Sequence, residues 1–198
     1  MKKQNKFWNG KITGICGAGM QFSKACMNRL LDRLSTHLTR PNLCSVGKGV
    51  VIQHGTAIRY PSQVDLGNDV RIGRNAEISS ESGHGRLLVG DDTWIGRKCR
   101  LDFTGGLTIG KNCTLSENVT IFTHAHGLKP RSEPEMKSIT IGDRVWIGAN
   151  STILHNVSEI GDDSIIGAGS IVTESIPPGV IVAGNPGCVI GEIKKDQG

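Results

Sequence analysis

The sequence predicts an all-β chain wound into a parallel β-helix of about six triangular coils, with a short α-helical N-terminal region and a protruding loop. The first observation is an aliphatic anchor at every sixth position, in six runs of three. The second is a small residue at position five of nearly every hexad, counted from the anchor. The third is Gly at position two in ten of the eighteen hexads, which fits tightly turning corners. A fixed short period is typical of stacked, near-identical units.

The hexads define the geometry of one coil. Position five and the next anchor are two residues apart, so both face the same side of an extended strand. We expect this side to be the interior. Three strands and three corners make a coil of eighteen residues, and successive coils pair in parallel about 4.8 Å apart. The anchors are Val46, Ile52, Ile58, Leu66, Ile72, Ile78, Val89, Ile95, Leu101, Ile109, Leu115, Ile121, Ile141, Ile147, Ile153, Ile160, Ile166 and Val172.

Extra residues interrupt the array only after the third hexad of a coil, so all of them emerge along one corner of the prism. The longest insertion, 127–140, contains Pro130 and Pro134 and is expected to be a loop. Because loops on a rigid scaffold carry function, this corner is the place to look for a site. The chain then divides into an N-terminal helical extension over 1–43, the β-helix over 44–178, and a C-terminal cap and tail over 179–198.

The N-terminal extension contains an apolar four-residue spacing that predicts a helix over 20–38. The helix could pack on the main domain or on a neighbouring subunit. It could also rest on a membrane surface as a basic amphipathic helix, since Lys24, Arg29 and Arg33 lie among the apolar residues.

Composition narrows the function classes. The net charge of +5 is modest and scattered, which does not favour nucleic-acid binding. The six cysteines form no CxxC pair, and Cys99 and Cys113 fall at position five, where they are expected to fill the core. No stretch is apolar enough for a transmembrane span, and no clear signal peptide is present. We therefore expect a cytoplasmic protein.

Two histidines close the coil before the long insertion. The register places Ala125 inward and its neighbours His124 and His126 outward. They could be solvated surface residues or hydrogen-bond the loop. An outward histidine beside a cleft can also act as a general base near neutral pH. Two histidines could chelate a metal, but no third histidine is clearly placed, so no metal is expected.

Other outward positions could wall a ligand groove. Trp94 and Trp146 lie on the same face, two coils apart, and could contact either a subunit or a ligand. Ala149 and Ala168 stack in adjacent coils as a row of small residues, which is either filler or the floor of a groove for a thin ligand.

Four segments resemble the bacterial hexapeptide-repeat acyltransferases, above all the maltose and galactoside acetyltransferases and the enzymes that O-acetylate polysaccharide sugars. These segments cover residues 118–126, 141–148, 166–172 and 183–186. The resemblance extends over about residues 46–190 and implies a left-handed β-helix, acetyl-CoA as co-substrate, and a homotrimer with the coenzyme between neighbouring subunits.

The resemblance also implies roles for individual residues. His126 matches the catalytic histidine of the family. Trp146, Ala149, Ala168 and Thr173 match positions associated with the coenzyme. Asp102 lies near the region that binds the acceptor in the family. His124 is also expected to contact the acceptor, although relatives often have another residue at its position.

These observations favour an acetyl-CoA-dependent O-acetyltransferase acting on a sugar hydroxyl, with the sugar a free saccharide or a surface-polysaccharide precursor. An antibiotic or another small hydroxyl compound is an alternative acceptor. A metalloenzyme resembling the γ-carbonic anhydrases and a non-catalytic β-helix scaffold are the alternative classes.

Overall fold

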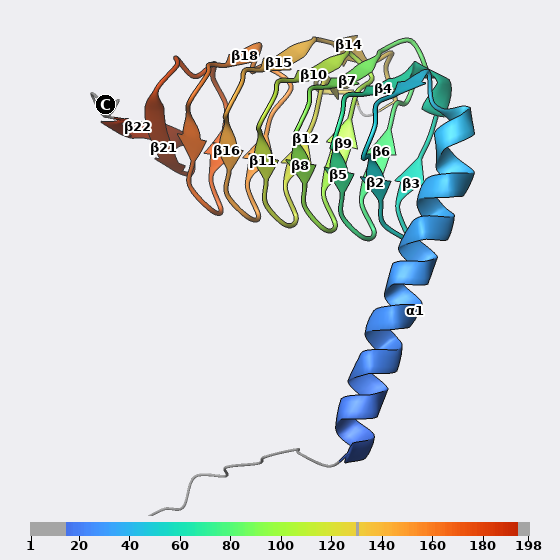
Figure 1. The fold of residues 1–198 in the computed structure, drawn as a ribbon. Coiled ribbons are helices and arrows are strands. Elements are labelled where there is room, and N and C mark those ends of the chain that lie inside the picture. The colour runs from blue at the N-terminus through green and yellow to red at the C-terminus, as the bar shows by residue number, and fades with distance from the viewer. Residues whose placement is uncertain (1–14, 130, 194–198) are drawn as a thin grey trace, which may run out of the picture.

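The computed structural model describes residues 15–129 and 131–193. These residues form a triangular prism of stacked coils, with one long helix across the end where the first coil lies (Figure 1). The helix, α1, spans Ile15–Thr39 and is followed by the short 3-10 helix η1, Arg40–Asn42. A second 3-10 turn, η2, spans Pro61–Gln63.

Three parallel sheets, here called A, B and C, form the sides of the prism. Sheet A contains β1 (Ser45–Val46), β4 (Val64–Leu66), β7 (Leu87–Val89), β10 (Leu107–Ile109), β15 (Ile139–Ile141) and β18 (Glu159–Ile160). Sheet B contains β2 (Val51–Ile52), β5 (Arg71–Ile72), β8 (Trp94–Ile95), β11 (Thr114–Leu115), β16 (Trp146–Ile147), β19 (Ile165–Ile166), β21 (Val180–Gly184) and β22 (Gly187–Glu192). Sheet C contains β3 (Ala57–Ile58), β6 (Glu77–Ser79), β9 (Arg100–Asp102), β12 (Thr120–Ile121), β17 (Thr152–Ile153) and β20 (Ile171–Val172).

The coils stack anchor upon anchor. Leu115, for example, pairs with Ile95 below it and with Ile147 above it, both in parallel. Six full coils result, and a seventh begins where Ile176 bridges to Ile160 and β21 adds to β19. The antiparallel strand β22 then closes sheet B. The fold class predicted from the hexads is confirmed.

The interior is a column of aliphatic side chains. Every anchor is buried except Val46 and Ile58 in the first coil, and these two pack against the core. Cys99 and Cys113 are also buried, as their position in the hexad predicts, and burial raises the pKa of the Cys99 thiol to about 11. Both cysteines therefore fill space in the core.

The corners turn for a different reason from the one that the glycine pattern suggests. Residues at position four, such as Asn75 and Asn118, take the left-handed conformation in the first and second hexads of all six coils. The glycines at position two have negative φ. They are needed because the backbone of the next coil lies too close for a side chain. A Cβ on Gly90 would lie 2.7 Å from the carbonyl carbon of Gly110 in the next coil. The left-handed turn is therefore made by Asn, Asp and other residues at position four.

The inward register also changes at the corner that carries the insertions. Ala125, expected to point inward, is only half-buried, whereas Thr123 is fully buried. Phe103 and Ser80 occupy the equivalent position in the two preceding coils and are buried as well. The expectation for Ala125 was wrong because the chain leaves the coil after Thr123. It forms the antiparallel pair β13 (His124–Ala125) and β14 (Glu135–Met136) before it returns at β15.

Helix α1 closes the open end of sheet B. The Thr36 hydroxyl accepts a hydrogen bond from the backbone N–H of Ile52 at 2.9 Å and donates to its carbonyl at 3.1 Å. Asp32 accepts from the backbone N–H of His54 and pairs with Arg74 at 3.1 Å. These contacts satisfy polar groups that the first strand of a sheet otherwise leaves unpaired.

We predict that the Ile95→Ala substitution lowers the free energy of unfolding by about 2–5 kcal/mol, because the fully buried side chain leaves a cavity in the stacked column. Ile190→Ala is the matched control, since Ile190 is 67% exposed. Denaturant unfolding measures both. Equal stability of the two variants would contradict the assignment of the hexad anchors to the core.

Candidate functional site

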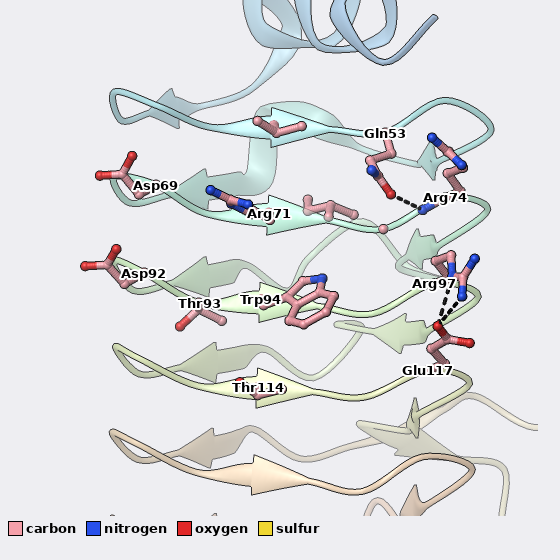
Figure 2. A pocket seen from close by; sticks show the side chains of 13 residues that line it. Gln53, Asp69, Arg71, Arg74, Asp92, Thr93, Trp94, Arg97, Thr114 and Glu117 are labelled. Carbon is pink, nitrogen blue, oxygen red and sulfur yellow. Dashed lines mark hydrogen bonds and ion pairs between the residues drawn. The ribbon is translucent and has the colours of Figure 1, made fainter. Parts of the chain in front are cut away.

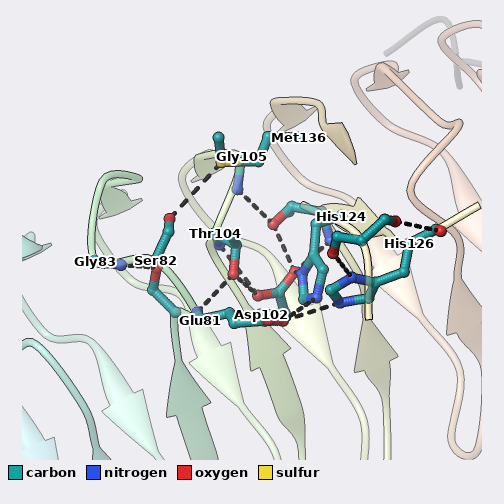
Figure 3. A network of polar contacts seen from close by, with 12 residues as sticks. Glu81, Ser82, Gly83, Asp102, Thr104, Gly105, His124, His126 and Met136 are labelled. Carbon is teal, nitrogen blue, oxygen red and sulfur yellow. Dashed lines mark hydrogen bonds and ion pairs between the residues drawn. The ribbon is translucent and has the colours of Figure 1, made fainter. Parts of the chain in front are cut away.

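A cluster of polar side chains lies at the corner where sheet C passes into sheet A, in the second to fourth coils (Figure 3). It joins Glu81, Asp102, Thr104, Thr123 and both histidines. The histidines follow β12, and Asp102 ends β9 in the coil below. The cluster therefore depends on coil stacking, because its members come from three successive turns of the prism.

Asp102 is the buried centre of this cluster. Its Oδ2 accepts hydrogen bonds from the backbone N–H of Thr123 at 2.6 Å and from the Thr123 hydroxyl at 2.7 Å. Its Oδ1 accepts from the N–H and hydroxyl of Thr104. Burial alone raises the pKa of this carboxyl, but these hydrogen bonds outweigh it and the pKa is lowered. Asp102 is therefore a fixed negative charge beneath the histidines.

His124 lies between two carboxylates. Its Nδ1 is 2.9 Å from Asp102 Oδ2, and its Nε2 is 2.8 Å from Glu81 Oε2. Only 16% of its side chain is exposed. Asp102 thus fixes the orientation of this ring, as carboxylates do for catalytic and metal-binding histidines.

His126 is held by the loop instead. Its Nδ1 is 2.7 Å from the carbonyl oxygen of Ser132, while the Ser132 hydroxyl donates to the carbonyl of His126. A carbonyl can only accept, so Nδ1 carries the proton and Nε2 is the basic atom of the neutral ring. The Ser132 hydrogen bond and the Glu81 carboxylate raise the pKa of His126 above its usual value.

Glu81 connects the two histidines. Its Oε2 is 2.8 Å from His124 Nε2 and 3.2 Å from His126 Nε2. The three donor atoms lie within 4.8 Å of one another, which is a spacing that a divalent transition metal could use. The Glu81 side chain is 51% exposed, so its carboxylate lies at the solvent-facing side of the cluster.

Gly105 allows the loop to close over the cluster. A Cβ at this position would lie 2.4 Å from the carbonyl oxygen of Lys137 and 2.5 Å from that of Thr123. The backbone N–H of Gly105 donates to the Thr123 hydroxyl at 3.0 Å. Any larger residue would push away the segment that returns from β14. The absence of a side chain at Gly105 therefore lets the backbones at Thr123 and Lys137 approach each other.

A hollow of about 370 Å³ opens beside His124 on the outer face of sheet C. Arg59, Arg100, Glu77 and Phe122 line it together with the edge of the cluster. Its mixture of charged, hydroxyl and aromatic groups suits a polar small molecule.

A larger hollow, of about 860 Å³, lies on sheet B around Trp94 (Figure 2). It contains Arg71, Arg74 and Arg97, of which Arg74 pairs with Asp32 and Arg97 with Glu117. No histidine is among its lining residues.

Three of the four residues matched to the coenzyme, Trp146, Ala149 and Ala168, lie on another side of the prism from the histidines of the same chain. Trp146 is in β16 on sheet B, 51% exposed, with its Nε1 donating to the Ser116 hydroxyl at 3.0 Å. Ala149 and Ala168 stack at the corner between sheets B and C, where the N–H of Gly169 donates to the carbonyl of Ala149. Thr173 follows β20 on the histidine side of sheet C, two coils beyond β12.

Sequence reasoning missed Glu81 and Ser132 as members of the site. A signal for Glu81 exists, because it occupies position four of its third hexad, as His124 does two coils later. Ser132 lies in the insertion, where no periodicity indicates that its carbonyl returns to His126.

The chain matches two family models, "Bacterial transferase hexapeptide (six repeats)" over residues 138–174 and "Hexapeptide repeat of succinyl-transferase" over residues 86–123. It is 39% identical over 140 residues to a galactoside O-acetyltransferase of Escherichia coli, covering 69% of this chain and 60% of that protein. It is 27% identical over 193 residues to the putative lipopolysaccharide biosynthesis O-acetyl transferase WbbJ of Escherichia coli, covering 91% and 90% of the two chains.

Among solved structures, the chain is similar to AntD, an N-acyltransferase from Bacillus cereus in complex with dTDP and 3-hydroxybutyryl-CoA. The two share 25% identity with a TM-score of 0.71, over 80% of this chain and 87% of that one. Together with the six-residue repeat and the stacked coils, these matches identify the chain as a hexapeptide-repeat protein that is similar to acyltransferases.

Proposed function

We propose that this protein is an acetyl-CoA-dependent O-acetyltransferase that modifies a hydroxyl group of a sugar. The observation that carries the proposal is the pair of histidine Nε2 atoms directed at one point beside an open hollow, with His126 oriented through its Nδ1–H. The similarity to galactoside and lipopolysaccharide O-acetyltransferases supports the choice of a sugar as acceptor.

His126 is the general base in this proposal. Its Nε2 removes the proton of the acceptor hydroxyl as the oxygen attacks an acyl carbonyl carbon. Acetyl-CoA, when bound, supplies that carbonyl as a thioester. As the carbon–sulfur bond breaks, the protonated His126 returns the proton to the departing thiolate. The Ser132 carbonyl keeps the ring in the required tautomer throughout.

His124 and Asp102 position the acceptor. Asp102 fixes the His124 ring, so that His124 Nε2 can hydrogen-bond the hydroxyl that His126 deprotonates or one next to it. The Glu81 carboxylate contacts the Nε2 atoms of both histidines, where the acceptor hydroxyl would bind, and the entering sugar displaces it. Arg59 and Arg100 lie along the same hollow, where they would contact other oxygens of the acceptor.

Trp146, Ala149, Ala168 and Thr173 are proposed to contact the coenzyme. Trp146 and the alanines lie on or beside sheet B, whereas the histidines lie at the opposite edge of sheet C. Within one chain, the coenzyme-binding half and the histidine half of the proposed groove therefore lie on different sides of the prism and do not meet. A homotrimer, in which the alanine row of one subunit faces the histidines of its neighbour, brings the halves together.

A metal-dependent enzyme is the second candidate, because Glu81, His124 and His126 offer three ligand atoms in one place. Asp102 and the Ser132 carbonyl would orient the two histidines in the way that metal-bound histidines are oriented. Metal analysis separates the candidates. Zinc in one-to-one ratio, with activity lost on chelation and regained on addition, favours the metalloenzyme. Full acetyl transfer after chelation favours the histidine base.

We predict that His126→Ala lowers kcat for acetyl transfer to an accepted sugar by about 10²–10⁴-fold, the usual contribution of a general base. Thiol release from acetyl-CoA, measured across a panel of sugars, provides the assay. His84→Ala is the control, because His84 is exposed in a neighbouring insertion. Full turnover by His126→Ala would remove this residue from the mechanism.

The pH profile provides a second prediction. The base must be deprotonated, so a raised His126 pKa places the acid limb of kcat/KM above the pKa of a free imidazole. Glu81→Gln removes the negative charge beside Nε2 and should move this limb to lower pH. Glu77→Gln, in the same hollow but paired with Arg100, should leave it in place. An unmoved limb in Glu81→Gln would show that the carboxylate does not act on the base.

The shared groove predicts complementation between inactive subunits. Ala168 is exposed, so Ala168→Trp should block the coenzyme groove without disturbing the core. Mixed oligomers of His126→Ala and Ala168→Trp chains should regain about a quarter of the activity, since a quarter of their interfaces then carry both intact halves. Light scattering checks the trimer. Mixed oligomers without activity would place the whole site within one subunit.

A further inference from the structure

Helix α1 is amphipathic in the reverse of the expected sense. The residues that face the prism are polar, among them Asp32, Ser35 and Thr36, each of which hydrogen-bonds the first coils. The large apolar residues of the spacing that predicts the helix are exposed instead. The exposed set is Met27, Leu30, Leu31, Leu34 and Leu38, of which Leu38 is 68% and Leu30 53% exposed. The helix is therefore held to its own domain by polar contacts.

The spacing of these exposed residues defines one continuous surface, here called the leucine stripe. They recur at three- and four-residue intervals over Met27–Leu38, so they occupy a single face of α1. At 100° per residue this face lies roughly opposite the polar residues that contact the prism. A contiguous apolar stripe on an exposed helix marks an interaction surface.

A basic groove borders the stripe. Arg29, Arg33, His37 and Arg40 line a hollow of about 430 Å³ between α1 and the first coil. Asp32 is the acidic residue in this hollow, and Arg74 and His54 already engage its carboxylate. The groove therefore presents net positive charge immediately beside apolar side chains.

The charge of the whole chain is concentrated in the same region. Residues 1–40 hold eight of the 23 Lys and Arg residues and one of the 18 Asp and Glu residues, a net charge of +7. The remaining 15 basic and 17 acidic residues leave the rest of the chain at −2. The net positive charge of the chain, described above as scattered, is therefore located in residues 1–40. That segment also contains Phe7 and Trp8, in a stretch outside the described residues.

We propose that the leucine stripe and the basic groove of α1 dock the protein on an anionic lipid bilayer. The leucines enter the headgroup boundary, and Arg29 and Arg33 bind lipid phosphates at its surface. No helix among the described residues is long and apolar enough to cross a membrane. Figure 1 shows that α1 runs across the end of the prism and extends past its edge. With the exposed leucine stripe of this helix on the bilayer, the prism stands on end. The His124 coil then lies three coil steps, about 14 Å, beyond the first coil.

Charge complementarity favours a bilayer over a second copy of this chain. Two copies of α1 meeting along their stripes would bring two arginine-lined grooves together, and like charges repel. An anionic surface satisfies the same arginines and covers the same leucines.

Vesicle co-sedimentation of the full chain tests the proposal. The probe is a set of vesicles made of phosphatidylglycerol and phosphatidylcholine in equal parts, compared with vesicles of phosphatidylcholine alone. We expect binding to the anionic vesicles, falling as salt is added. Arg29→Gln/Arg33→Gln should weaken it about 25-fold, since each basic residue near an anionic surface contributes about fivefold. Leu30→Gln/Leu34→Gln should weaken it at least tenfold.

Matched controls separate the surface from general effects. Lys98→Gln/Lys111→Gln removes the same charge from exposed positions on the prism, and Ile190→Gln removes an exposed aliphatic side chain at the opposite end. Both should bind like the unmodified chain. Circular dichroism verifies that all variants are folded.

Two outcomes would overturn the proposal. One is unmodified protein that remains in the supernatant with anionic vesicles. The other is a Leu30→Gln/Leu34→Gln protein that binds as well as the unmodified chain. If the leucine variant instead loses a subunit in light scattering and the unmodified chain ignores vesicles, the stripe belongs to a second copy. Vesicle binding is measured without acetyl transfer. A negative result in one assay therefore leaves the proposal tested by the other assay unaffected.

Discussion

The parallel backbone ladder between successive coils is the constraint on which the rest of this protein depends. Each strand is only two or three residues long over most of the prism, so no strand is stable alone. Stability comes from stacking, which pairs Leu115 with Ile95 and Ile147 and buries all three. A side chain at a corner is consequently fixed by the coils above and below it, and this rigidity lets three coils contribute to one polar cluster.

A ladder of this kind needs protection at its two ends. The last coil is closed by β22, which folds back antiparallel on β21. The first coil is closed by α1, whose Thr36 hydroxyl takes the place of a neighbouring strand at Ile52. The polar face of α1 is used for this closure, and this use leaves the leucines outward. The proposed membrane surface is thus a consequence of how the helix closes the prism.

The candidate site forms where the ladder is interrupted. Once the chain departs after Thr123, position five no longer points inward, and Thr123 becomes the buried residue that donates to Asp102. The return of the loop, permitted by Gly105, brings the Ser132 carbonyl to His126. The regular coils form a rigid scaffold, and the polar cluster forms where the insertion interrupts them. The two histidines are held by different contacts: His124 by the Asp102 carboxylate of the coils, and His126 by the Ser132 carbonyl of the loop.

The sequence by itself determined the stacked coils, the buried anchors and the corner at which the insertions emerge, because a six-residue period imposes the same environment at every repeat. It also identified Asp102, His124 and His126 as candidates through their place in the register and their resemblance to a known family. Only the tertiary structure decided that Glu81 joins both histidines, that Ser132 orients His126, and that α1 turns its leucines outward. These three depend on contacts between segments without a shared period. Local spacing encodes which face of a helix or coil a residue occupies, whereas the partner of that face is set by how distant segments pack.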